Sequence, residues 1–154
     1  MENPLSPVEL RVLGALVEKE STTPEYYPLT LNSLVAACNQ KTNRWPVTEY
    51  SEDEVAEGID GLKARGYAAS ITGGSRVAKF AQRFTEKLNL GRRENAILCV
   101  LMLRGQQTVG EIKGRTEDYV ANVVDDGGDL PSGTPVLIVA EGDRGSLLVT
   151  KHEM

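Results

Sequence analysis

Apolar residues recur at helical spacing in three segments of the first half of the chain, and each segment begins with a residue suited to cap a helix. The expected N-caps are Ser6 with Glu9 three residues on, Thr30, and Ser51 with Glu54 three residues on. The predicted helices run over residues 7–20, 31–39 and 52–65. Gly66 follows the third helix, where glycine suits a left-handed C-terminal cap.

A hairpin pattern comes next. Tyr67–Ile71 and Arg76–Phe80 read as strands on either side of Gly73 and Gly74. Three helices followed by a two-stranded hairpin are the elements of a winged helix. We therefore predict a first winged-helix domain over residues 1–84.

The second half repeats this order with shorter segments. The first predicted helix covers residues 91–104. A capping box over 108–111 opens a second, short helix, in which Val109 and Ile112 should point inward. A third helix is predicted from Thr116 onward. The predicted strands are residues 135–140 and 146–151. The fold class is α+β, mostly helical, with two tandem winged-helix domains (a helix-turn-helix with a β-hairpin wing). The second, shortened domain covers 90–154, and a polar connector over 85–89 joins it to the first.

The helix over 91–104 is apolar nearly all round from Ala96 to Leu103, so more than one side of it has to be covered. We expect it to form a homodimer contact or a tight contact between the two domains. The candidate interface residues are Ile97, Leu98, Val100, Leu101, Met102 and Leu103.

Composition narrows the class of protein. The 154 residues are 40% hydrophobic and 25% charged, as in ordinary folded proteins, and the longest apolar run, 96–103, is far shorter than the roughly 20 residues of a membrane span. We expect neither a membrane span nor a signal peptide. Cys38 and Cys99, isolated within apolar helical patterns, are typical of buried thiols and favour a cytoplasmic location.

No catalytic or metal site is predicted. His152 is the only histidine, so neither a zinc site of Cys and His ligands nor a Ser-His-Asp triad can be assembled. The glycine-rich stretches 73–75 and 142–145 match neither a P-loop nor a dinucleotide fingerprint. We expect a protein that is not an enzyme, with no cofactor and no small-molecule substrate.

Charge disfavours DNA binding by the third helix of either domain. The net charge is -5, residues 51–65 carry five acids against two bases, and residues 116–130 carry five acids and no base. In a DNA-reading winged helix the third helix lies in the major groove, where phosphates would repel these acids. These acids also have a structural explanation. Negative side chains in the first turn interact favourably with the positive end of the helix dipole, and exposed carboxylates keep the helix surface hydrated. The functional interpretation is an acidic surface for a protein partner.

One basic set remains as a candidate nucleic-acid site in the first turn and wing. Its members are Lys41, Arg44, Arg76, Lys79 and Arg83. Asn39, Gln40 and Asn43 belong to types that hydrogen-bond adenine edges, and Trp45 can stack on a splayed base.

The same turn also has a structural interpretation. Arg44 can pair with Glu18 or Glu20, while the asparagines cap helix ends and form turns. Trp45 beside Pro46 can be a packing plug.

Several separated motifs carry a resemblance to a known family. These are LSPVELRVLGALVEKE, TTPEYYPLTLNSLVAACNQKTNR, SEDEV, GSRVAKF and LCVLMLRGQQTVGEI, which together cover Leu5 to Ile112. They resemble the YceH-like family of uncharacterised bacterial proteins. The resemblance implies two tandem winged-helix domains, with DNA binding suggested by that fold rather than by a known site.

Two functions follow from these observations. The first is a non-catalytic protein-interaction or regulatory binding module that docks on another protein or on a second copy of itself. The alternative is a DNA-binding transcription regulator that uses the first-domain turn and wing, with weak binding that falls as salt rises.

Overall fold

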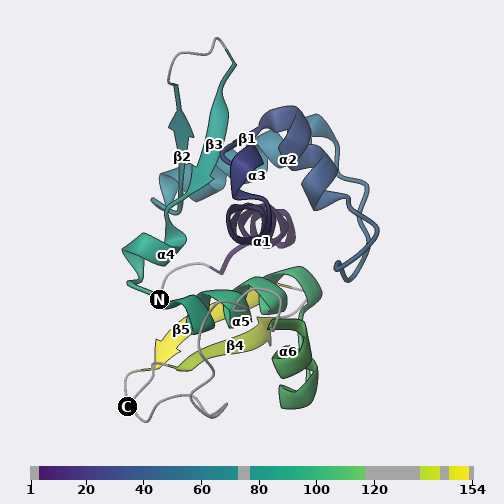
Figure 1. Ribbon diagram of the computed structural model, residues 1–154, viewed down its shortest axis with the longest axis vertical. Coiled ribbons are helices and arrows are strands. Elements are labelled where there is room, and N and C mark those ends of the chain that lie inside the picture. Colours follow the sequence, from purple (N-terminus) through teal and green to yellow (C-terminus); the bar gives the residue numbers. More distant parts are fainter. Residues whose placement is uncertain (1–3, 73–76, 117–135, 143–145, 153–154) are drawn as a thin grey trace.

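The computed structural model describes residues 4–72, 77–116, 136–142 and 146–152, and it shows an α+β protein built mainly of helices (Figure 1). The elements in chain order are α1 (Pro7–Thr22), the 3-10 turn η1 (Pro24–Tyr26), β1 (Leu29–Thr30), α2 (Leu31–Cys38), α3 (Glu52–Ala64), β2 (Ala68–Ile71), β3 (Lys79–Gln82), α4 (Phe84–Lys87), α5 (Arg92–Arg104), α6 (Val109–Thr116), β4 (Val136–Gly142) and β5 (Ser146–His152).

The first three long helices begin where their caps predict. The hydroxyl of Ser6 accepts a hydrogen bond from the backbone N–H of Glu9, and the carboxylate of Glu9 accepts one from the N–H of Ser6. Ser51 and Glu54 form the same capping box at α3, and Thr30 caps α2. Each box satisfies two donors that a helix start otherwise leaves free.

Helix α1 is the centre of the core. Every residue from Leu10 to Glu18 is buried, because α5 packs on one side of α1 while α2 and α3 cover the other (Figure 1). Apolar side chains of α1, α3 and α5, among them Leu16, Ile59 and Leu98, join one hydrophobic cluster. The first unit and α5 therefore share a core.

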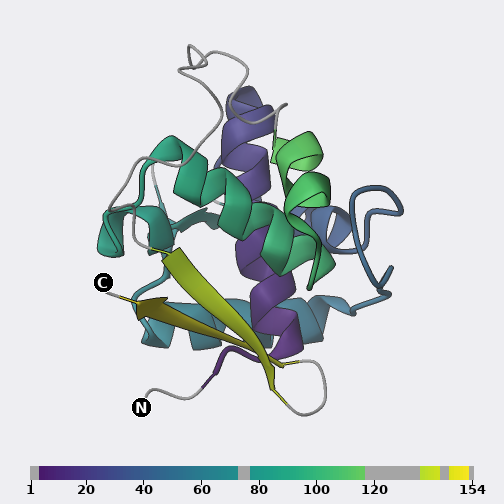
Figure 2. The same cartoon turned by 90° about the horizontal axis from the view of Figure 1, so that it is seen from below.

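The apolar surface of helix α5 is buried against α1 of the same chain. Figure 2 shows α5 crossing α1, which is the tight contact between the two halves that the sequence offered as one of two explanations. Of the candidate interface residues, Leu98, Val100, Met102 and Leu103 are buried, and Ile97 and Leu101 are half-buried. The homodimer stays a prediction. The helix with nine consecutive buried residues is α1, not α5.

A glycine lets the two helices approach closely. A Cβ placed on Gly14 would lie 2.8 Å from Cδ2 of Leu103 and 3.2 Å from Cβ of Met102. The thiol of Cys99 lies 3.6 Å from the carbonyl oxygen of Gly14. Because Cβ atoms essentially never come within 3.0 Å of another heavy atom, any other residue at position 14 has to displace the Leu103 side chain or push α5 away from α1.

The small sheet of the first unit has the antiparallel order β1-β3-β2. Ala68 pairs with Gln82 and Ile71 with Lys79, so β3 begins three residues later than the sequence predicted. Strand β1, which pairs Leu29 with Phe80, was not predicted. Two residues carry no periodic signal, and β1 exists only because β3 lies beside it.

The second half agrees with its predicted order as far as it is described. Helix α5 ends at Gly105, which has a φ of 73°, and Thr108 with Glu111 forms the predicted capping box of α6. Val109, predicted to point inward, is 83% exposed, whereas Ile112 is half-buried. The hairpin β4-β5 pairs Val136 with His152 through to Gly142 with Ser146. The helix predicted from Thr116 onward lies outside the described residues.

The connector between the halves is not wholly irregular. Phe84 begins the one-turn helix α4, is buried at 1% exposure, and meets the ring of Tyr67 edge-on at 5.0 Å between centroids. A single turn without a side-chain cap gives no signal in the sequence. The connector is therefore fixed to the first unit.

Candidate functional site

The loop between α2 and α3, residues 39–50, carries most of the residues singled out in the first unit. It leaves the helical core at one side of the molecule (Figure 2). Three polar side chains anchor it, and two of them belong to residues that the sequence offered as nucleic-acid contacts.

Arg44 is the first anchor. Its side chain is fully buried, and Nη2 and Nη1 donate to the two carboxylate oxygens of Glu18 at 2.6 and 2.9 Å. The same guanidinium donates to the carbonyl oxygens of Ala37 and Asn43. Burial alone would raise the pKa of Glu18, but the hydrogen bonds and charge of Arg44 outweigh burial and hold that pKa below its ordinary value.

This pair confirms the structural interpretation of Arg44 and removes it from the nucleic-acid set. A guanidinium with no exposed surface, bound to a carboxylate, cannot meet a phosphate without opening the core.

Arg11 is the second anchor, and the sequence analysis did not single it out. It is buried in α1 and donates to the carbonyl oxygens of Cys38 and Pro46, at 3.0 and 2.6 Å, and to the hydroxyl of Thr48 at 2.9 Å. Arg11 and Glu18 lie seven residues apart in the buried part of α1, from Leu10 to Glu18, which is otherwise apolar. Two charges on the buried part of such a helix are the signal that could have revealed them.

Asn39 is the third anchor. It is the C-cap of α2, and its side-chain amide exchanges two hydrogen bonds of 2.8 Å with the backbone of Tyr50. Its Oδ1 also accepts from the hydroxyl of Thr48. Asn43 adopts a positive φ of 56°, as a turn asparagine does. The structural interpretation of both asparagines is confirmed.

The loop nevertheless presents an apolar surface. Trp45 is 72% exposed and Val47 is 50% exposed, although the backbone N–H of Trp45 donates to the carbonyl oxygen of Leu103 at 2.9 Å. The prediction that Trp45 is a packing plug is therefore wrong. Its backbone is fixed to α5, but its ring faces away from the core.

The other basic candidates are spread over the first unit. Lys41 and Arg83 are exposed, and Lys79 of β3 is half-buried. Arg76 lies outside the described residues. The acids of α3, in contrast, are all exposed: Glu52, Asp53, Glu54, Glu57 and Asp60.

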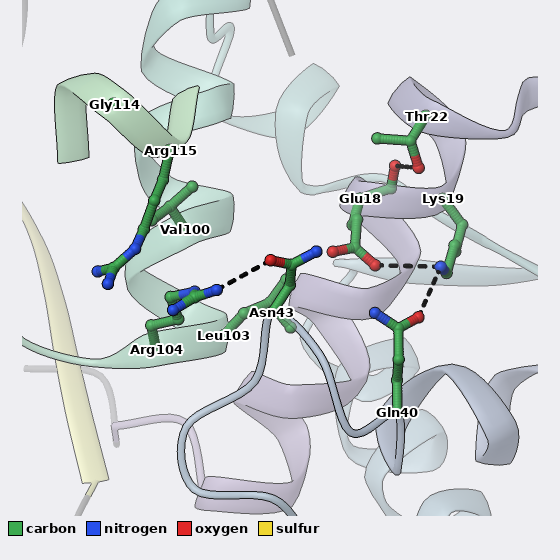
Figure 3. Close-up of a pocket in the computed structure, with 10 residues that line it drawn as sticks. All are labelled: Glu18, Lys19, Thr22, Gln40, Asn43, Val100, Leu103, Arg104, Gly114 and Arg115. Carbon is green, nitrogen blue, oxygen red and sulfur yellow. Dashed lines mark hydrogen bonds and ion pairs between the residues drawn. The ribbon is translucent and has the colours of Figure 1, made fainter. Parts of the chain in front are cut away.

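A polar cavity of about 320 Å³ lies between α1, the loop, α5 and α6 (Figure 3). Its lining residues are Glu18, Lys19, Thr22, Gln40, Asn43, Val100, Leu103, Arg104, Gly114 and Arg115. Five of these ten residues were named from the sequence, each for another role. The sequence did not predict the cavity, because its lining comes from four segments spread over almost one hundred positions and shares no spacing.

The chemistry of the remaining groups is limited. Within residues 4–72 and 77–116, no cluster of three or more His, Cys, Asp or Glu residues is arranged to hold a metal ion. Both cysteines are buried, and burial raises the pKa of the Cys38 thiol to about 12. None of the helices in the described part has the length and apolar character of a membrane span.

The chain is similar to a family described as "Protein of unknown function, DUF480", whose profile matches residues 5–125. A UPF0502 protein of Solibacter usitatus is 61% identical over 117 residues, which are 76% of this chain and 57% of that protein. One of Opitutus terrae is 58% identical over 113 residues, 73% of this chain and 49% of the relative. One of Geotalea uraniireducens is 48% identical over 143 residues, 90% of this chain and 65% of the relative. The chain thus spans about half to two thirds of the length of these curated relatives.

Proposed function

The chain belongs to the DUF480 family, the family of uncharacterised bacterial proteins that its motifs resemble, and we propose that it is a non-catalytic binding module that docks on a basic protein surface. Its docking surface consists of the exposed acids of α3 together with Trp45 and Val47 of the preceding loop. The exposed acids of α3 are the observation that carries this proposal.

The scaffold we propose is a tandem winged helix. In residues 7–82 a helix, a short strand, two helices and a hairpin follow one another, and the strands form an antiparallel sheet of order β1-β3-β2. This order supports a winged helix in the first unit, with α3 as its third helix. In the second half, two helices and a final hairpin support a shorter copy.

The charge of α3 favours protein over DNA. Five exposed carboxylates stand against exposed Lys63 and against Arg65, which is engaged with Glu9 at 3.3 Å. A helix with this surface repels phosphates in a groove and attracts lysine and arginine side chains. The exposed bases Lys41 and Arg83 are too few to reverse this balance.

The loop supplies the apolar part of the surface. An exposed tryptophan is the residue type that most often dominates a protein interface. Since Arg11, Arg44 and Asn39 fix the backbone around it, Trp45 is held in place before any partner arrives, which lowers the entropic cost of docking. The matching partner carries basic residues around an apolar pocket that accepts an indole ring.

The proposal is tested by affinity capture from a lysate of the source bacterium, with mass spectrometry of the bound proteins. We expect a basic protein to be retained by the wild-type chain, lost with Trp45→Ala, and lost with the double change Glu52→Lys and Asp53→Lys. Tyr26→Ala is the matched control, because Tyr26 is 73% exposed but belongs to η1, outside the proposed docking surface. Capture that is unchanged by Trp45→Ala and by the charge reversal contradicts the proposal.

A second arm separates protein from DNA. Fluorescence anisotropy of random and genomic duplexes, measured from about 50 to 200 mM salt, should show no binding at physiological salt. Tight binding with a slope near -0.9 per neutralised phosphate would instead favour the DNA-binding alternative through the first turn and wing.

A further inference from the structure

We propose that the cavity between α1, α5 and α6 binds a small organic anion that carries a phosphate or carboxylate group. This inference is independent of the docking surface, since none of the cavity's lining residues belongs to that surface. It rests on three converging cations, on the weak partners that two of them have now, and on the size of the cavity.

Three separate helices bring cations to this cavity. Lys19 comes from the last turns of α1, Arg104 from the end of α5, and Arg115 from the end of α6. Among the described residues of the lining Glu18 is the one carboxylate, so their formal charge is three positive against one negative, a net +2. This local surplus stands in a chain whose net charge is -5.

The negative charge of Glu18 is neutralised by a cation that does not line the cavity. Arg44, which does not line the cavity, binds both carboxylate oxygens of Glu18, whereas Lys19 approaches only one of them, at 3.3 Å. Buried Arg44 thus neutralises the single acid in the lining. The three lining cations retain their attraction for an anion.

Two of the cations donate to neutral amides, and Lys19 also lies 3.3 Å from the carboxylate of Glu18. Lys19 Nζ donates to Oε1 of Gln40 at 2.9 Å, and Nη2 of Arg104 donates to Oδ1 of Asn43 at 2.9 Å. Within the described part of the chain, Arg104 has no carboxylate partner. An ionised oxygen is a stronger acceptor than an amide oxygen, so an anionic ligand can displace both contacts with a gain in hydrogen-bond strength.

The geometry suits a compact ligand. In Figure 3, Arg104 and Arg115 lie on one side of Asn43, while Lys19 and Gln40 lie on the other. Val100 and Leu103, both buried, add an apolar part to this polar lining. A volume of about 320 Å³ is at the lower end of small-molecule sites, which excludes a long polymer and fits a molecule of metabolite size.

Arg115 is the most tightly engaged of the three. Its guanidinium donates to Gln107 and to Glu111 on its own helix, the latter at 3.3 Å, and it is about one third exposed. The contact with Glu111 is an exposed pair of the kind that contributes little to stability. We therefore assign Lys19 and Arg104 the main role and Arg115 a supporting one.

Isothermal titration calorimetry of the full chain tests the proposal with two compact probes, pyrophosphate and citrate, at constant ionic strength set with sodium chloride. Saturable binding of pyrophosphate alone assigns a phosphate ligand, and binding of citrate alone assigns a carboxylate ligand. Arg104→Gln and Lys19→Gln should each weaken binding about tenfold, which corresponds to the loss of one charge-assisted hydrogen bond.

The matched control is Arg92→Gln, which removes an exposed arginine from the start of α5, the end of that helix opposite to Arg104. We expect Arg92→Gln to bind like the wild type. Arg104→Gln should fold normally, because Arg104 is half-buried and, among the described residues, its side chain donates only to the exposed Asn43. An unchanged melting temperature without ligand checks this. The proposal is overturned if neither probe binds above the sodium chloride control, or if Arg104→Gln and Lys19→Gln bind as tightly as Arg92→Gln.

Discussion

Replacing Glu18 by alanine should destabilise the whole fold, although this residue lies outside the proposed docking surface. The change leaves Arg44 charged, with no exposed side-chain surface and without its carboxylate. It also removes one of the contacts through which α1 holds the loop over residues 39–50. Glu57→Ala is the matched control, because Glu57 is an exposed glutamate inside a helix of the same unit.

The magnitude follows from the contacts of Arg44. Breaking a buried ion pair by removing one partner costs about 3–5 kcal/mol. Here the carbonyl oxygens of Ala37 and Asn43 still accept from the guanidinium after the change, so we expect the lower value, about 3 kcal/mol. For a chain of this length that is a fall in Tm of about 6–12 °C. Glu57→Ala should stay within about 0.5 kcal/mol of the wild type.

Urea unfolding followed by circular dichroism measures both variants, with Trp45 fluorescence reporting on the loop. A second variant, Glu18→Leu with Arg44→Met, removes both charges and should recover much of the loss, because a matched apolar pair avoids a buried unpaired charge. If Glu18→Ala unfolds at the same urea concentration as Glu57→Ala, the ion pair does not hold the loop and our account of the anchor is wrong.

The remaining predictions concern packing, pH and the thiols. Gly14→Ala should cost about 1–3 kcal/mol in thermal unfolding by pushing α5 from α1, while Gly110→Ala, with open space around it, should be neutral or stabilising. Because folding lowers the pKa of Glu18, the ionised carboxylate contributes its full stability above pH 4.5, the ordinary pKa of a glutamate, and this contribution is lost as the pH falls below that value. In Glu18→Ala the free energy of unfolding should therefore depend less steeply on pH in that range. Cys38 and Cys99 should resist a thiol reagent at pH 8 until urea unfolds the chain; fast labelling of either contradicts their burial.

The sequence predicts local structure where a few neighbouring residues decide it. A serine or threonine cap with a glutamate three residues on forms its hydrogen bonds within one turn, so the starts of α1, α3 and α6 were predicted correctly. Strand β1 and helix α4 were missed because nothing local stabilises them. β1 depends on a strand some fifty residues later, and α4 depends on the burial of Phe84 beside Tyr67.

The candidate site was less predictable for the same reason. Whether Arg44 faces a phosphate or a carboxylate depends on Glu18, which lies 26 residues earlier in the chain. The pattern of α5 shows that the helix needs cover but does not identify α1 as the helix that supplies it. The exposure of Trp45 also has no local signal, since an indole beside a proline occurs both in cores and on surfaces.

The burial of α1 between two layers has a consequence for synthesis on the ribosome. Gly14 meets Cys99 across 85 positions of the chain, so α1 emerges long before the helix that covers one of its sides. At roughly 5–20 residues per second, the interval is on the order of 4–17 s. During that interval α2 and α3 can already pack on one side of α1, while the strip around Gly14 stays open to water. The nascent chain therefore displays an apolar strip that the finished protein hides, and this strip is where a ribosome-associated chaperone would bind or where two nascent chains would stick together.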